Sequence, residues 1–117
     1  QGYVTLTGRI KEVINRGGES ISAVEIERLI SGHPDVQLVA VVPMPDKDLG
    51  EQACAYVQAR SDVNLDFEGI VAFLKSRKVS ILQLPERIEF VDAIPLTKTG
   101  KLNKRALIED IRKKIGI

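Results

Sequence analysis

Residues 37–45 read QLVAVVPMP, an uninterrupted apolar segment that is rich in valine and lies among prolines. Such a short, β-branched run is more typical of a buried strand than of a helix. The next segment, EQACAYVQA at residues 51–59, alternates more clearly, which predicts a second strand. Because only the polar connection DKDLG separates the two segments, we expect them to pair with each other.

Helical periodicity occurs on either side of this pair of strands. Ser22 and Glu25 have the spacing of a capping box, so a helix should begin there and run to about Ser31. Pro34 forbids its continuation. The apolar face of this helix should comprise Val24, Ile26, Leu29 and Ile30. A second amphipathic helix should run from residue 66 to about residue 77, with an apolar stripe of Phe67, Ile70, Val71 and Leu74.

The two ends of the chain complete the expected fold. ERIEFVDA at residues 86–93 alternates and predicts a third strand. A last helix should carry the stripe Leu107, Ile108, Ile111 and Ile115. Residues 3–14 read as two extended pieces around a Gly8-Arg9 turn, and NRGGES then supplies a second turn. We therefore expect a small α+β domain with a mainly antiparallel three-stranded sheet, three flanking helices and a leading two-stranded hairpin.

Composition excludes several classes of protein. A chain of 117 residues fits one domain, and it contains no apolar run near the ~18 residues that cross a bilayer. Its 17 basic and 16 acidic residues nearly cancel, so no overall field attracts nucleic acid or acidic lipid. The lone Cys54 forms no internal disulfide, and the chain has no signal-peptide pattern, which favours a cytoplasmic setting. Because Gln1 is not an initiator residue, we expect a fragment of a larger protein.

The segment PLTKTGKLNKRAL at residues 95–107 concentrates four basic side chains around one glycine. It could be a solvated surface loop, which is the ordinary explanation of a charge run. It is not a nucleotide-binding P-loop, because no glycine precedes Gly100 at the required spacing and Leu102 replaces the required Ser or Thr. In the third interpretation, Gly100 permits a tight turn and Lys101 presents an ammonium to a phosphate or carboxylate outside the domain. This interpretation explains the arrangement best.

The same segment resembles the last core motif of the adenylate-forming ligases, which include acyl- and aryl-CoA synthetases, nonribosomal adenylation domains and luciferases. TGRIKEVINRGGESISAVEIE at residues 7–27 is similar to the hinge and following loop of these enzymes. Both motifs occur in the family's order, so the resemblance covers essentially the whole chain as the C-terminal lid domain, with the larger N-terminal domain absent. GEQACAYV and LPERIEFVDAIPLTKTGK look closest to 2,3-dihydroxybenzoate-AMP ligases of the aryl-acid group and to acyl-CoA synthetases.

The resemblance implies a two-step reaction. A carboxylic acid attacks the α-phosphate of ATP to give acyl-AMP and pyrophosphate, and a pantetheine thiol then displaces AMP. Lys101 matches the lysine that stabilises the first step electrostatically, and Thr97 and Gly100 match its supporting loop. ATP and Mg²⁺ would be bound mainly by the absent N-terminal domain, and CoA or the phosphopantetheine of a carrier protein would be the acceptor. The fragment alone is expected to be inactive.

Further site residues follow from the same match. Lys11 matches the hinge about which the domain rotates, and Arg9 matches a nucleotide-binding position. Gly17 and Gly18 match the loop that lines the pantetheine tunnel, where the lack of a Cβ permits close approach. Arg16 could contact the carrier protein or the thiol arm. Without the motif, each of these would be an ordinary turn or surface residue.

Several alternatives stay open. The enzyme could be an acyl-CoA synthetase instead of a carrier-loading aryl-acid ligase, or the chain could be a free-standing module that binds an anion or a carrier protein. We expect no nucleic-acid or membrane partner. No metal site is expected, because His33 has no second ligand at a suitable spacing. Acetylation of Lys101, a switch known among relatives, would remove its charge.

Overall fold

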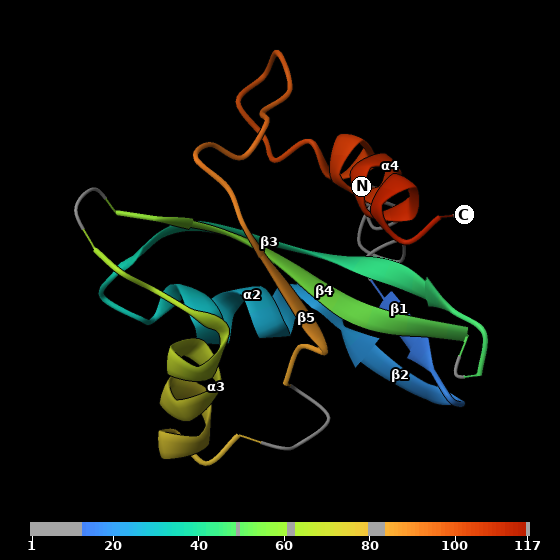
Figure 1. Ribbon diagram of the computed structural model, residues 1–117, viewed down its shortest axis with the longest axis horizontal. Helices are drawn as coiled ribbons and strands as arrows, with labels where there is room; N and C mark the ends of the chain where they lie inside the picture. Colours follow the sequence, from blue (N-terminus) through green and yellow to red (C-terminus); the bar gives the residue numbers. More distant parts are fainter. Residues whose placement is uncertain (1–12, 49, 61–62, 80–83, 117) are drawn as a thin grey trace, which may run out of the picture.

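The computed structural model describes residues 13–48, 50–60, 63–79 and 84–116, which form a sheet with helices on both faces (Figure 1). The elements are, in chain order, β1 (Val13–Arg16), β2 (Glu19–Ser22), α2 (Ala23–Ser31), β3 (Val36–Asp46), β4 (Gly50–Ala59), α3 (Phe67–Ser76), β5 (Arg87–Phe90) and α4 (Lys104–Lys114). Helices α2 and α3 cover one face of the sheet and α4 covers the other. The α+β class is therefore confirmed.

Strands β3, β4 and β5 form the three-stranded part of the sheet. β3 and β4 are antiparallel, as expected from their short polar connection, and Val42 lies opposite Cys54. β5 pairs with β4 in parallel, with Ala55 opposite Ile88. Parallel pairing requires the chain to cross over between the strands, and α3 lies within this connection. The sheet is thus mixed and not purely antiparallel.

The hairpin at the start of the described chain lies later in the sequence than the hairpin that we predicted. β1 and β2 pair across Gly17 and Gly18, whose φ angles of +56° and +89° suit the tight turn of a two-residue hairpin. The predicted hairpin at residues 3–14 lies outside the described residues, except for its last two positions, which belong to β1. Arg16 pairs with Gly50 and thereby joins the hairpin to β4.

Two apolar cores explain the uninterrupted run of β3. Val39 and Val41 face the core beneath α2 and α3, whereas Ala40 and Val42 face the core beneath α4. Because both faces are covered, the four successive residues 39–42 are all buried. The predicted apolar face of α2 is correct at Ile26 and Ile30 but wrong at Val24, which is 43% exposed; Ala23 is buried instead.

Side-chain caps begin all three described helices. The Ser22 hydroxyl accepts from the backbone N–H of Glu25 at 3.1 Å, which confirms the predicted helix start. Asp66 caps α3 in the same way, and the side-chain oxygen Oδ1 of Asn103 accepts from the N–H of Ala106 at 3.2 Å to begin α4. None of these helices combines the length and apolarity that spanning a bilayer requires. Capping thus defines where α4 starts, directly after the basic loop.

A polar network holds α4 against the sheet. The Tyr56 hydroxyl on β4 donates to the Asp110 carboxylate on α4 at 2.5 Å. The Lys114 ammonium lies 3.1 Å from Asp110 and 2.9 Å from Glu89 of β5. Arg87 donates to the same Glu89 carboxylate at 2.6 Å. The C-terminal half of α4 is therefore anchored to β4 and β5.

Candidate functional site

The basic loop is closed at its base by backbone contacts. The N–H of Asn103 donates to the carbonyl oxygen of Pro95 at 2.9 Å, and Leu96 and Leu102 form an isolated antiparallel bridge. The two ends of the loop therefore lie side by side, and the segment between them stands away from the sheet (Figure 1). This geometry places Lys98 and Lys101 on a short projection next to the start of α4, whereas Lys104 and Arg105 lie in the first turn of that helix.

A turn at the tip of the loop presents Lys101. The Thr97 N–H donates to the carbonyl of Lys101 at 2.7 Å, and the Gly100 N–H donates to the carbonyl of Thr97 at 2.9 Å. The Thr97 hydroxyl also accepts from the Lys101 N–H at 3.2 Å and lies 3.0 Å from the Thr99 hydroxyl. Gly100 has a φ of +86°, which other residues rarely adopt. Thr97 and Gly100 thus shape the turn, while the Lys101 and Lys98 side chains are exposed to solvent.

A groove of about 1130 Å³ lies between this loop, the start of α4 and strand β3. Its apolar lining is Leu38, Val41, Val42, Pro43, Leu96, Leu102 and Ile108. Its polar lining includes Glu27, Lys101, Lys104 and Arg105. Glu109 also lines the groove, which therefore combines an apolar floor with a rim of both basic and acidic side chains.

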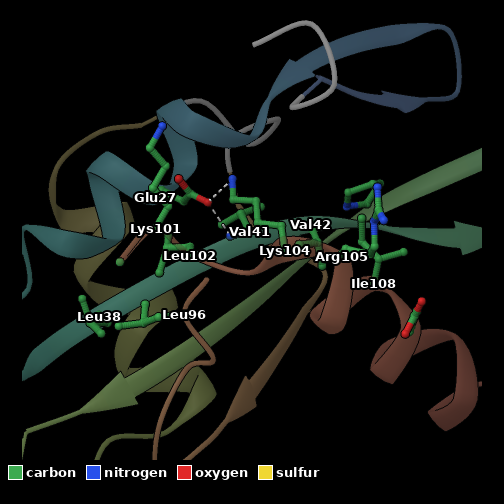
Figure 2. Close-up of a pocket in the computed structure, with 13 residues that line it drawn as sticks. Glu27, Leu38, Val41, Val42, Leu96, Lys101, Leu102, Lys104, Arg105 and Ile108 are labelled. Atoms are coloured by element: carbon green, nitrogen blue, oxygen red, sulfur yellow. Dashed lines mark hydrogen bonds and ion pairs between the residues drawn. The ribbon is translucent and has the colours of Figure 1, made fainter. Parts of the chain in front are cut away.

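One ion pair in this groove was not predicted from the sequence. The Glu27 carboxylate of α2 lies 2.5 Å from the Lys104 ammonium of α4, and the two side chains are only 15% and 20% exposed. Figure 2 shows Glu27 joined by dashed lines to Lys104 and to Val41. The two residues are far apart in the sequence, so no local spacing indicates their contact. Lys104 itself was recognised only as one of the loop's basic residues.

The structure does not bring the other predicted site residues to the basic loop. The Gly17–Gly18 turn lies well away from it in Figure 1. A Cβ on Gly18 would meet no atom of the described chain within 4 Å, so within this domain its positive φ, and not crowding, favours glycine. Arg9 and Lys11 lie outside the described residues, and of Arg16 only the backbone, in β1, is described.

The remaining chemically distinctive residues pack within the fold. The Nδ1 atom of His33 accepts from the N–H of Asp35 at 3.0 Å, and its ring lies edge-on to Phe73. Cys54 is fully buried. Within the described ranges, no group of three or more His, Cys, Asp or Glu side chains could hold a metal ion. The basic loop and the groove beneath it therefore remain the candidate site.

An α+β domain with a lysine exposed on a projecting loop agrees with the class of domain implied by the sequence motifs. The family described as the AMP-binding enzyme C-terminal domain matches residues 25–101, a segment that ends on Lys101. The chain therefore belongs to the family of AMP-binding enzyme C-terminal domains.

Characterised relatives agree with this assignment. The chain is 41% identical to the 2,3-dihydroxybenzoate-AMP ligase of Bacillus subtilis over 97% of its length and 21% of the relative's length. It is 39% identical to the medium-chain fatty-acid–CoA ligase of Escherichia coli, over 97% of this chain and 20% of that protein. The chain thus spans about a fifth of the length of these relatives.

Solved structures support the fold. A fatty acyl CoA synthetase from Mycobacterium tuberculosis matches with a TM-score of 0.83 and 37% identity, over 91% of this chain and 21% of that chain. The apo structure of MbtA from Mycobacterium smegmatis matches with a TM-score of 0.78 and 37% identity, over 88% and 19% of the two chains. The similarity therefore extends over nearly all of the domain described above.

Proposed function

We propose that this chain is the mobile C-terminal domain of an ATP-dependent carboxylic acid ligase, and that its partner is the larger N-terminal domain of the same protein. The observation that carries the proposal is the exposed Lys101 on a closed loop that projects from the domain. Because the Lys101 side chain is exposed at the turn of this loop, its ammonium can enter an active site that another domain forms. The protein would work in the cytoplasm, where ATP and CoA are available.

In the first step, a carboxylate attacks the α-phosphate of ATP and pyrophosphate leaves. Negative charge develops on the oxygens around the reacting phosphorus, and a positioned ammonium lowers the energy of that transition state. Lys101 supplies this charge, while Thr97 and Gly100 hold the turn that presents it. Mg²⁺ and ATP would be bound mainly by the larger domain, as the resemblance to the ligase family implies.

In the second step, a pantetheine thiol displaces AMP after the domain has rotated. We propose Lys11 as the hinge and Arg9 as a contact to the nucleotide. Gly17 and Gly18 would line the thiol tunnel, because the exposed turn can approach another domain without side chains in between. Arg16 would contact the carrier protein or the thiol arm. Rotation of the domain would move Lys101 away from the reacting atoms, so that Lys101 acts in adenylation and not in thiol transfer.

Replacing Lys101 by alanine in the full-length protein tests the proposal. We expect ATP–pyrophosphate exchange to fall roughly a hundredfold or more, because the transition state loses a charge at close range. Thioester formation from preformed acyl-adenylate should be spared, because this lysine is remote in that step. Lys98→Ala is the matched control, since Lys98 is exposed on the same loop. Undiminished exchange in Lys101→Ala would contradict the proposal.

The acid and the thiol acceptor require a separate assay. The relatives include both an aryl-acid AMP ligase and a fatty-acid–CoA ligase by name, and we favour the aryl-acid type on the sequence motifs. Full-length protein should be incubated with aryl and fatty acids, ATP and either CoA or a holo carrier protein. Aryl thioester formed on the carrier alone would identify a carrier-loading ligase, whereas product with CoA would identify a CoA synthetase.

A further inference from the structure

The loop that carries Lys101 is joined to the domain through the first turn of α4. Asn103 both caps α4 and, through its N–H, donates to Pro95 at the other end of the loop at 2.9 Å. Lys104 is the next residue and the first of the helix. Whatever holds Lys104 therefore holds the base of the loop, three residues from Lys101.

Lys104 is held by Glu27, which belongs to the opposite layer of the domain. Its ammonium lies 2.5 Å from Oε2 of Glu27, and both side chains are mostly shielded from solvent. The same oxygen accepts from the N–H of Val41 at 2.7 Å (Figure 2). One carboxylate thus connects α2 below the sheet, strand β3 within it and α4 above it.

The position of this carboxylate follows from the free edge of the sheet. β3 lies at the end of the strand order among the described strands, so every second N–H points outward from the sheet. Val39, Pro43 and Pro45 share the strand parity of Val41. The two prolines carry no N–H, whereas the outward N–H of Val41 needs an acceptor. Glu27 satisfies this donor and extends around the edge to Lys104.

We infer that Glu27 and Lys104 are positioning residues that fix the Lys101 loop relative to the sheet. The inference rests on the proposed function and adds to it the part of the domain that sets where the lysine lies. A shielded carboxylate with a charged donor and a backbone donor is strongly oriented, because each bond is charge-assisted. Since a catalytic group displaced by about 1 Å can lose up to a hundredfold in rate, a loosened loop base should slow adenylation.

The test compares Glu27→Gln and Lys104→Met in the full-length protein. Glu27→Gln keeps an acceptor for the Val41 N–H and removes the charge, whereas Lys104→Met removes the same pair from the other helix. We expect each variant to lower kcat of ATP–pyrophosphate exchange roughly tenfold with an unchanged KM for ATP. Transfer from preformed acyl-adenylate to the thiol should keep its wild-type rate in both variants. Lys104→Arg keeps the positive charge, so its kcat of ATP–pyrophosphate exchange should stay near that of wild type.

Glu25→Gln is the matched control. Glu25 lies on the same helix and pairs with Arg28 of α2 instead of with α4, so the same substitution there should leave both steps unchanged. Hydrogen exchange measured by mass spectrometry supplies a readout that does not need activity. Peptides that cover residues 95–107 should exchange faster in Glu27→Gln and Lys104→Met than in Glu25→Gln.

The outcomes separate this inference from the proposed function. If the wild type exchanges pyrophosphate and Lys101→Ala does not, but both pair variants keep kcat and the wild-type hydrogen exchange, positioning by Glu27 and Lys104 is wrong and the ligase proposal stands. A wild type that exchanges no pyrophosphate with any acid overturns the ligase proposal. Hydrogen exchange then decides alone whether the pair holds the loop.

Discussion

At the scale of single residues, Cys54 shows how burial controls chemistry. The side chain lies fully buried in β4, on the face that packs against α4. Burial, together with the negative charge of Glu89, raises the pKa of the thiol to about 12 from its ordinary value of 9.0. Cys54 therefore packs as a small core hydrophobe.

The raised pKa predicts that Cys54 resists alkylation. At pH 9 an ordinary thiol is about half ionised, whereas a thiol with a pKa near 12 is ionised in roughly one molecule in a thousand. The tryptic peptide that contains Cys54 should therefore remain unmodified by iodoacetamide in native protein and become fully modified in urea. Rapid native alkylation, measured by mass spectrometry, would show that the strand opens or that the thiol is not shielded.

At the scale of secondary-structure elements, α4 is attached to the sheet by ionised groups. Burial by itself would raise the pKa of Glu89, but hydrogen bonds from Lys114 and Arg87 outweigh it and hold that pKa below 4.5. The hydrogen bond from Tyr56, followed by that from Lys114, lowers the pKa of Asp110. The attachment of α4 therefore depends on both carboxylates being ionised.

This dependence predicts a loss of stability in acid. A carboxyl group whose pKa is lowered by folding takes up protons more readily in the unfolded chain, so its contribution is complete above pH ~5 and is lost as the pH falls. The urea midpoint of wild type should drop between pH 5 and 3. Glu89→Gln should be less stable than wild type at pH 7, and the difference should shrink at pH 3. A difference that is equal at both pH values would mean that Glu89 contributes only by packing.

Glu68→Gln serves as the control for this measurement. Glu68 is an exposed carboxylate in the first turn of α3, on the opposite face of the sheet from α4. Its substitution should leave the pH dependence of the urea midpoint close to that of wild type. Equal effects of Glu68→Gln and Glu89→Gln would point to the change in net charge and not to the attachment of α4.

At the scale of the whole molecule, the sheet separates two cores. The side chains of Val41 and Val42 are 1% and 0% exposed although they point to opposite faces of β3. A sheet covered on one side only would leave one of them in solvent. The basic loop leads into α4, which packs on one face of the sheet and is joined through Lys104 to Glu27 of α2 on the other face.

The two-sided arrangement predicts that Val41→Ala and Val42→Ala are similarly destabilising. Each should lower the free energy of unfolding by roughly 1–3 kcal/mol, since each removes two buried methyl groups and leaves a cavity. Val24→Ala is the control, because Val24 is 43% exposed and alanine favours the helix in which it lies. Urea unfolding of the three variants checks the prediction; a neutral result at either Val41 or Val42 would contradict burial on both faces.

Local sequence determined which segments form helices and strands. The cap at Ser22, the apolar run of β3 and the stripe of α4 depend on contacts within a few residues, so they could be read in order along the chain. The basic loop was found for the same reason, because Gly100 and Lys101 are neighbours in one short motif. The assignments to Arg9 and Lys11 stay predictions.

Only the tertiary structure decided how these segments meet. The parallel pairing of β5 with β4, the exposure of Val24 and the Glu27–Lys104 pair all join or separate residues that are distant in the sequence. Periodicity indicates that a face is apolar, but it carries no information on which strand or helix will cover that face. Such contacts arise when the layers pack around the sheet, and at that stage an edge-strand N–H and a lysine of another helix come to share one carboxylate.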